Sequence, residues 1–551
     1  LVMLKRIDTA GAAIDAARPV FEVIAAKRPE EGARFCVLEA LFVWEKGDAT
    51  AGEKRLDACL ERFPDEPLAV REAVAQFDRA GRPERATSIL REALEREPKQ
   101  AEHRLALATR LREAGDTAAA EALLREGTTA LEGPGPWLAL HDHYVLTEDY
   151  ASALRAMERA LALQAEPPAA LRIAYADDLI LNGDLEKAEQ EASKIPAPGV
   201  HLVRGRILLA RGDAAAAVAE LEEGIRLWPD NPSARWLAGQ AAERAFDQPR
   251  AIAHYRESVR TDAGRTPAAR DLAELYAAMG SAEDALDFAM RNLEANPLDP
   301  DAALLLIRLS RRFDARSGRV MGLDALARIP GEQDQLLAQQ ALERALAEGD
   351  VAGIAWLERA AGAFGVDRIE CLKVMTELER RANRSKSAES RLKRLLRDDP
   401  DSVELLLLLA DLEVASADPP LVVRELLERA RKAAPSDPRV AIRLARNLAE
   451  SGEFTSAAAA YDSIPESAVE FGEAVMASIE LRRSLDAKHG VGRPDDPEAE
   501  GRLEAVLARD PRNGKAAFEL ARRLFEREPR SERAVALART AATLGAGAPA
   551  Q

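Results

Sequence analysis

The chain contains 551 residues, of which 47% are hydrophobic, 31% are charged and 4% are aromatic, and its formal net charge is −17. An acidic balance of this size disfavours a nucleic-acid partner that is held by overall charge. No apolar run reaches the roughly 18 residues that a membrane-spanning helix needs, so the sequence predicts no transmembrane segment.

The N-terminal residues 1–32 are predicted to form an orphan helix, interrupted near Arg18-Pro19 because proline lacks a backbone donor. Ala17, Phe21 and Ile24 have the spacing of the packing face of a second helix, whose partner would lie upstream or was never present. We therefore expect the chain to be a trimmed or processed piece of a longer protein. No signal peptide is predicted in the residues that are present.

Cys36 and Cys59 fall on the two helices of the next unit, both at packing positions. The favoured interpretation is two buried thiols that act as small hydrophobic residues. A disulfide is the alternative, and it would imply an oxidising compartment. The spacing of these cysteines matches no metal motif.

A period of 34 residues runs through the units that follow. Gly47, Gly81 and Gly115 are 34 residues apart, and Ala251 and Ala285 keep the same step in a later part of the chain. Helix pairs are predicted at 33–66, 67–100, 101–133, 134–168, 169–197, 198–231, 232–265 and 266–299, and the pair at 169–197 is shortened.

The unit at 198–231 shows the layout of one repeat. Its first helix ends at the Gly212-Asp213 turn, and its second helix ends at Pro229. Gly205 stands where two helices could approach closely. Each helix would be marginal alone, so packing against neighbouring helices is expected to stabilise it.

Beyond residue 308 the pattern blurs, because Gly318, Gly322 and Pro330 interrupt the expected second helix. We therefore predict a boundary between an N-terminal array, residues 1–330, and a C-terminal array, residues 331–551. The period returns at 335–368, 369–402, 403–437 and 438–466, before a predicted loop insertion at 486–497 and a last unit from residue 514.

A 34-residue period with two helices per unit is the signature of tetratricopeptide repeats, and the residues of this chain resemble that family. In one unit the matching residues are Trp137, Leu140, Tyr144, Tyr150, Ala153 and Ala160. In another they are Leu272, Ala273, Tyr276, Gly280, Ala285 and Pro297. The resemblance implies an all-α fold, a right-handed superhelical solenoid of helix-turn-helix repeats.

The sequence carries no phosphate-binding loop, zinc-protease motif or nucleophile elbow. His141 and His143 are two residues apart on a predicted helix, so their side chains diverge and structural or solvated roles are favoured. We therefore predict a chain that is not an enzyme and has no cofactor and no metal site.

In the family that the chain resembles, the first helices of the repeats line the concave surface. This implies a groove formed by Ile173, Asp177, Leu202, Arg206, Leu209, Trp236, Gln240, Arg270, Glu274, Leu304 and Arg308. Mixed apolar and charged residues suit an extended peptide or a partner helix. Packing between helices is the alternative role for the leucines, and Trp236 is the favoured anchor because aromatic residues carry a large share of binding energy.

A second surface is predicted on residues 384–397. Its basic residues are Arg384, Lys386, Arg391, Lys393, Arg394 and Arg397. A solvated outer face is the favoured interpretation. Docking of an acidic protein, lipid headgroups or RNA is the alternative.

The favoured function is a non-enzymatic scaffold that binds a protein or peptide partner, with no small-molecule substrate. The Ala/Arg/Leu-rich composition is typical of bacterial proteins, and the chain resembles long bacterial tetratricopeptide proteins of exopolysaccharide export and envelope assembly. That resemblance implies assembly of a multiprotein complex in the bacterial cytoplasm or in the periplasm and envelope. An RNA-binding helical-repeat protein and a non-catalytic regulatory part of a larger enzyme are the alternatives.

Overall fold

The computed structural model describes residues 7–64, 66–360, 368–416, 420–489 and 497–545. These residues form helices and connecting turns, and none of them lies in a β-strand. The chain divides into two compact units, residues 1–203 and 204–551. The predicted boundary at 330/331 falls inside the second unit and stays a prediction. Residues 490–496 of the predicted insertion lie outside the described residues, and both segments that flank them are helical.

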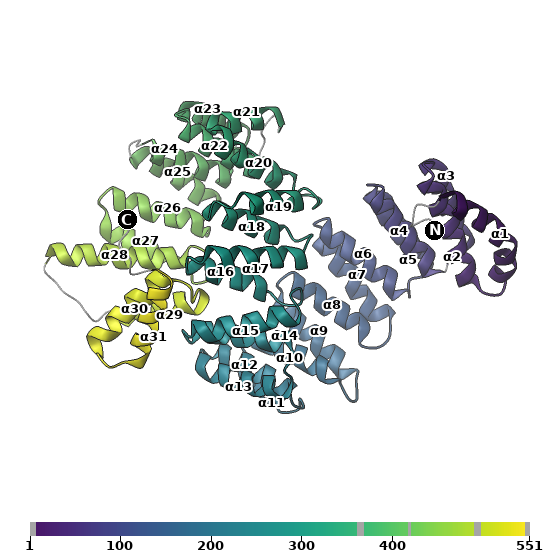
Figure 1. Ribbon diagram of the computed structural model, residues 1–551, viewed down its shortest axis with the longest axis horizontal. Helices are drawn as coiled ribbons and strands as arrows, with labels where there is room; N and C mark the ends of the chain where they lie inside the picture. Colours follow the sequence, from purple (N-terminus) through teal and green to yellow (C-terminus); the bar gives the residue numbers. More distant parts are fainter. Residues whose placement is uncertain (1–6, 65, 361–367, 417–419, 490–496, 546–551) are drawn as a thin grey trace. The chain divides into compact units, whose positions relative to one another are not determined.

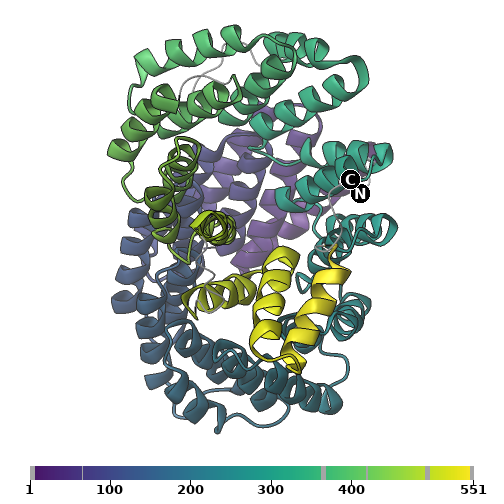
Figure 2. The same ribbon diagram turned by 90° about the vertical axis from the view of Figure 1, so that its left-hand side faces the viewer.

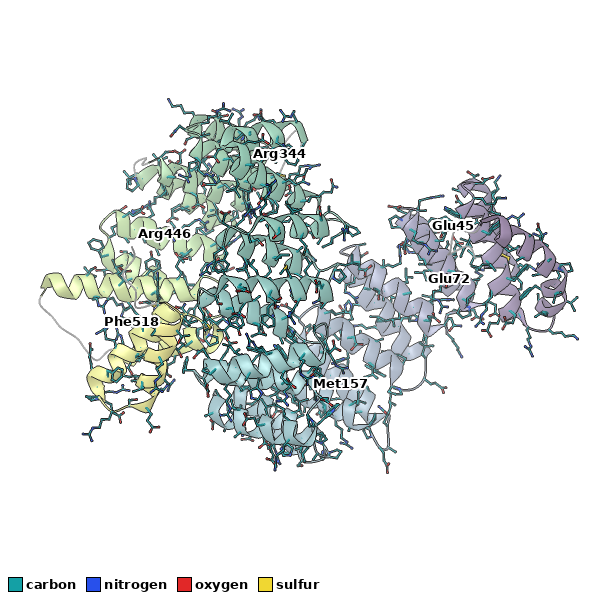
Figure 3. The ribbon with its side chains drawn as sticks, viewed as in Figure 1. Glu45, Glu72, Met157, Arg344, Arg446 and Phe518 are labelled. Atoms are coloured by element: carbon teal, nitrogen blue, oxygen red, sulfur yellow. A yellow bond between two sulfur atoms is a disulfide. The ribbon has the colours of Figure 1, made fainter. Side chains whose placement is uncertain are left out.

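The first unit is a series of helix pairs that follow one another along the chain (Figure 1). Its helices are α1 (Ile7–Ala25), α2 (Pro29–Glu45), α3 (Ala49–Arg62), α4 (Pro67–Arg79), α5 (Pro83–Arg96), α6 (Ala101–Glu113), α7 (Thr117–Ala130), α8 (Gly135–Leu146), α9 (Tyr150–Ala162), α10 (Ala169–Leu181) and α11 (Leu185–Ala192). Side chains fill the space between them, and Met157, labelled in Figure 3, is only 1% exposed.

The second unit continues the pattern. The boundary at 203/204 lies inside α12 (Gly199–Ala210). The helices that follow are α13 (Ala214–Leu227), α14 (Pro232–Arg244), α15 (Gln248–Thr261), α16 (Ala268–Ala278), α17 (Ala282–Ala295), α18 (Pro300–Arg312), α19 (Arg316–Leu326), α20 (Gln333–Glu348), α21 (Asp350–Ala360), α22 (Ile369–Arg381), α23 (Ser385–Asp398), α24 (Val403–Ala415), α25 (Pro420–Ala433), α26 (Pro438–Glu450), α27 (Phe454–Asp462), α28 (Phe471–His489), α29 (Pro497–Arg509), α30 (Gly514–Arg527) and α31 (Glu532–Thr543).

In many of the described pairs the turn between the two helices places one residue in the left-handed backbone region. Glycine takes this position in many repeats, as at Gly47 (φ 95°) and Gly212 (φ 81°), because it has no Cβ to clash. An aspartate often follows and caps the second helix; the side chain of Asp213 accepts the backbone N–H of Ala216 at 3.1 Å.

Among the residues that the structure describes, four that are not glycine hold the same left-handed position. These residues are Glu148 (φ 60°), Phe246 (φ 61°), Asp314 (φ 50°) and Asn383 (φ 58°). These four residues stand at turns where the 34-residue spacing of the glycines is interrupted. The helix pairs therefore continue through these repeats although the glycine is absent.

Small residues let the helices approach closely. Ala251 is completely buried on α15. A Cβ on Gly205 would lie 2.4 Å from the side chain of Leu221, and one on Gly239 would lie 2.5 Å from the ring of Tyr255. Real Cβ atoms do not approach this closely, so the expected close approach at Gly205 is confirmed.

Two predicted helix interruptions are wrong. Helix α1 runs through Pro19, and the stacked rings of Phe21 and Phe35, 4.4 Å apart, hold it against α2. Helix α19 runs through Gly318 and Gly322, which are buried against α18; their added Cβ atoms would lie 2.2 Å from Ser310 Oγ and 2.6 Å from Ile307. Glycine acts here through close packing, not as a helix breaker.

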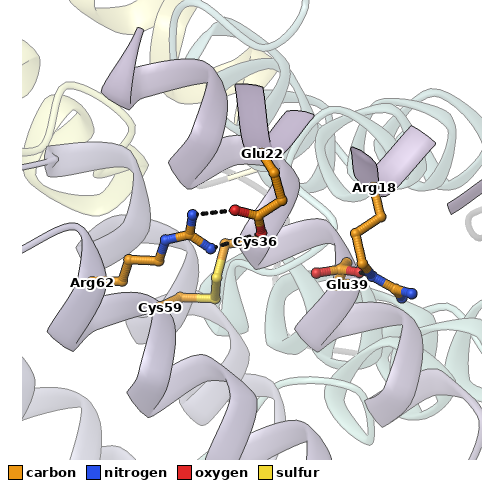
Figure 4. Close-up of a disulfide and its surroundings, with 6 residues drawn as sticks. All are labelled: Arg18, Glu22, Cys36, Glu39, Cys59 and Arg62. Atoms are coloured by element: carbon orange, nitrogen blue, oxygen red, sulfur yellow. Dashed lines mark hydrogen bonds and ion pairs between the residues drawn. A yellow bond between two sulfur atoms is a disulfide. The ribbon is translucent and has the colours of Figure 1, made fainter. Parts of the chain in front are cut away.

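Cys36 and Cys59 form a disulfide (Figure 4), so the favoured interpretation of two free thiols is wrong. The paired helices α2 and α3 bring the two Cα atoms to 5.7 Å, within the range that a disulfide spans. Arg62 of α3 also donates to both carboxylate oxygens of Glu22 on α1, at 2.9 and 2.6 Å. The first three helices are therefore joined by covalent and polar links.

Candidate protein-binding surface

A hollow of about 820 Å³ opens on α16, α18, α20 and α22, which are first helices of successive repeats. Arg270 and Glu274 of α16 and Leu304 and Arg308 of α18 line it. The other lining residues are Asp301, Leu305, Ile307, Arg311, Gln335, Gln339 and Glu370. The structure thus brings four of the residues that were assigned to the groove onto one surface; their role in binding stays a prediction.

Ion pairs between neighbouring repeats shape the wall of this hollow. Arg308 donates to Glu274 at 3.0 Å, and its side chain is 65% exposed. Arg311 donates to Glu343 of α20 at 3.1 Å, and burial lowers its pKa in spite of that hydrogen bond. Arg308 is therefore free to turn toward a ligand at little cost, whereas Arg311 is held by the fold.

Trp236 of α14 is half-buried, and its indole N–H donates to Asp271 on α16 at 2.8 Å. Asp271 is buried, and this burial raises the pKa of its carboxyl against the opposing effect of the Trp236 hydrogen bond. Trp236 consequently contacts a carboxylate cluster next to the hollow and does not line the hollow itself.

The remaining groove positions are not brought to this hollow. Gln240 of α14 and Arg206 and Leu209 of α12 are half-buried in the second unit. Ile173 and Asp177 on α10, like Leu202, belong to the first unit and are half-buried too.

The predicted basic outer face lies on and beside α23. Two of its members are engaged by carboxylates. Arg391 is bound by both oxygens of Glu379, at 2.5 and 2.8 Å, and its side chain is only 13% exposed. Lys393 pairs with Glu389 and lies 3.7 Å from Glu413. Part of this basic charge therefore serves intramolecular pairing, and docking at this face stays a prediction.

His141 and His143 are both buried on α8. Burial lowers the pKa of His141, but hydrogen bonds to Asp142 and Asp178 outweigh it and raise the pKa to about 9. Burial lowers the pKa of His143. His141 is thus a charged link between α8 and α10, since its Nε2 lies 3.1 Å from Asp178.

In the part of the chain that the structure describes, no cluster of three or more His, Cys, Asp or Glu side chains is arranged to hold a metal ion. Likewise, no described helix has both the length and the apolar character that crossing a membrane requires.

Helix pairs with a recurring turn, stacked through small residues, define an all-α helical-repeat solenoid. Residues 79–140, 202–266 and 424–468 match family models described as tetratricopeptide repeats. Over these residues the chain therefore carries tetratricopeptide repeats. Repeats of this class form extended surfaces that act as protein-interaction scaffolds and generally carry no catalytic residues.

The solved structures that match this chain share little sequence with it, and their TM-scores are low. A tetratricopeptide repeat protein from Parabacteroides merdae is 17% identical, with 42% of this chain and 93% of that chain covered and a TM-score of 0.31. Yeast Tom70 is 12% identical, with 86% and 99% covered and a TM-score of 0.37. Cut9–Hcn1 of the APC/C hetero-tetramer is 12% identical, with 83% and 97% covered and a TM-score of 0.27. No curated protein sequence matches the chain.

Proposed function

We propose that the chain is a non-catalytic scaffold that binds a segment of a partner protein in the hollow on α16, α18, α20 and α22. The observation that carries this proposal is the composition of the hollow, where the half-buried Leu304 lies among arginine and carboxylate side chains. Such a surface offers apolar area for affinity and charged groups for orientation.

The partner segment is a peptide of a few residues or one face of a helix. A volume of about 820 Å³ accommodates several side chains, and the exposed Arg308 can exchange its pairing with Glu274 for a carboxylate of the ligand. We infer that the preferred segment combines a large apolar residue with an acidic residue.

Selection of a displayed peptide library against the full chain tests this proposal. The selected peptides should bind Leu304→Ala and Arg308→Ala variants roughly five- to thirtyfold more weakly, because each substitution removes a contact worth roughly 1–2 kcal/mol. Arg291→Ala on the second helix α17, where the exposed arginine pairs with Asp287, is the matched control and should bind like the original chain. Equal affinity for all four chains would refute the hollow as the binding site.

We further propose that the scaffold serves assembly of a bacterial envelope complex. The Cys36–Cys59 disulfide supports an oxidising compartment such as the periplasm. Thiol alkylation in intact cells should leave both cysteines unlabelled until a reductant is added. Labelling of both cysteines before the reductant is added would place the chain in a reducing compartment and would refute the proposed location in the envelope.

A further inference from the structure

Three carboxylates from two neighbouring repeats converge within the second unit. Glu243 lies near the end of α14, and Asp271 and Glu274 lie one turn apart on α16. Glu243 and Asp271 are only 3% and 6% exposed. We call these three residues the carboxylate pocket. Buried like charges repel each other and require a cation.

Fixed donors hold the carboxylate pocket in place. The hydroxyl of Tyr255 donates to Glu243 Oε2 at 2.6 Å, and the indole of Trp236 donates to Asp271 Oδ2 at 2.8 Å. Gly239 leaves the space that the Tyr255 ring occupies. The carboxylate oxygens are therefore oriented before any cation arrives.

The cation in the pocket is Arg512, from the turn between α29 and α30. Its Nε and Nη2 donate to the two oxygens of Glu243 at 2.7 and 2.9 Å, and its Nη1 donates to Glu274 at 3.1 Å. Asp271 Oδ1 lies 4.0 Å from Nη2. The side chain of Arg512 is 17% exposed. The planar guanidinium holds its N–H donors in a fixed fork, so it can bond several of these oxygens at once. A lysine ammonium group lacks this geometry.

The turn that carries Arg512 is itself ordered by short polar links. The Asp510 carboxylate accepts the backbone N–H of Arg512 at 3.1 Å, and the Asn513 side chain caps α30 by accepting the N–H of Ala516 at 3.0 Å. The turn thus presents one arginine side chain to a pocket that is 269 residues away in sequence.

A second contact keeps the C-terminal helices at the same place. Thr540 of α31 donates to the side chain of Gln248 at 2.9 Å, and Phe246 packs against the apolar cluster of α28 to α31. In Figures 1 and 2 the yellow helices α29 to α31 lie beside the teal helices that these bonds join. The repeats of the second unit therefore close on themselves here.

The carboxylate pocket is continuous with the hollow. Glu274 belongs to both, and it receives Arg308 at 3.0 Å on one oxygen and Arg512 at 3.1 Å on the other. Arg512 in the pocket therefore binds the carboxylate of Glu274, which a ligand in the hollow would also contact.

We propose that the carboxylate pocket is a recognition site for an arginine side chain, that Arg512 occupies it within the same chain, and that an arginine-bearing peptide of a partner competes with Arg512 for it. In the closed state the C-terminal helices block the pocket. The proposal needs only the three carboxylates and Arg512, so it stands independently of peptide binding in the hollow.

The test uses the full chain and two synthetic peptides, one that copies residues 508–516 and one with alanine in place of Arg512. An Arg512→Ala chain should bind the first peptide at least tenfold more tightly than the second, and at least tenfold more tightly than the unmodified chain binds it. A Glu243→Gln, Arg512→Ala chain should lose this preference. Equal binding of the two peptides, or no binding of either, by the Arg512→Ala chain would overturn the proposal.

Hydrogen exchange provides a readout that does not depend on a peptide. Arg512→Ala should speed exchange in α29 to α31 at least tenfold while exchange in α2 to α9 of the first unit stays unchanged, which shows that the variant is folded. Arg512→Lys keeps the positive charge but loses the forked guanidinium. Its exchange rate in α29 to α31 should lie between the rates of the unmodified chain and of Arg512→Ala. Arg530→Ala, an exposed arginine in the next turn, is the control. Unchanged exchange in Arg512→Ala would overturn the proposal that Arg512 holds α29 to α31 at the carboxylate pocket.

Discussion

Individual residues in this chain are constrained most strongly at the turns between paired helices. The left-handed position is usually glycine, yet Glu148, Phe246, Asp314 and Asn383 adopt it too. In this region a residue with a Cβ destabilises the fold by roughly 1 kcal/mol relative to glycine. A substitution by glycine can therefore relieve the backbone strain in these repeats. The strain is tolerated because the helices on both sides are held by packing.

Glu148→Gly should stabilise the α8–α9 pair by about 0.5–1 kcal/mol, since Glu148 is exposed and glycine adopts its φ of 60° freely. Slower local hydrogen exchange in α8 and α9 would measure this gain. Glu148→Ala removes the side-chain atoms beyond Cβ but keeps the Cβ that strains the backbone, so it should give no gain. Equal stabilisation by both variants would contradict the backbone explanation.

His141 links charge to stability in the first unit. Its pKa of about 9 in the folded chain exceeds the ordinary value of 6.5, so the folded state holds the proton more tightly than the unfolded state. The stabilisation is complete below pH 6.5 and is lost as the pH rises through 9.

Opening of α8 and α10, measured by hydrogen exchange and corrected for the intrinsic rate, should therefore become easier between pH 6.5 and 9, by on the order of 2–3 kcal/mol. His141→Gln should remove this dependence on pH. A pH dependence that survives in His141→Gln would assign it to another group.

Whole helices in this chain depend on small residues that face their neighbours. Ala251 of α15 is completely buried against α14, whereas Ala253, two residues later, is exposed. The same substitution at these two positions therefore separates burial from helix propensity.

Ala251→Asp should destabilise the second unit by 3 kcal/mol or more, on the order expected for an unpaired buried charge. Ala253→Asp should cost less than about 1 kcal/mol. Thermal unfolding followed by circular dichroism measures both, and faster exchange in α14 and α16 should accompany the first substitution because each repeat is stabilised by its neighbours. Similar melting of the two variants would contradict the repeat register.

At the scale of the molecule, the second unit departs from an open array because its C-terminal helices contact helices near its start. The Thr540–Gln248 hydrogen bond is buried and joins residues that are 292 positions apart. A linear series of repeats has no counterpart to such a bond.

Thr540→Val should destabilise α31 by about 1 kcal/mol, because Gln248 loses its partner in a buried place. Exchange should become faster in α31 and also in α15. Thr543→Val is the control, since exposed Thr543 bonds only to Arg539 of its own helix. A change confined to α31 would show that the distant contact adds no stability.

The amino-acid sequence by itself determined the all-α class, the 34-residue period, the Gly-Asp turns and the buried small residues such as Ala251. These features depend on contacts within one repeat or with the next, so their residue types recur at a readable spacing. The family resemblance, not the period alone, implied that Arg270, Glu274, Leu304 and Arg308 share one surface, and all four line the same hollow.

Only the tertiary structure decided what the residues that depart from the repeat pattern do. It showed Gly318 and Gly322 inside a helix, Cys36 bonded to Cys59, and Arg512 in the carboxylate pocket. Each outcome depends on where distant side chains meet in space. Arginine and glutamate recur throughout this chain, so no local spacing distinguishes Arg512 and its two glutamate partners from the many pairs that lie on helix surfaces.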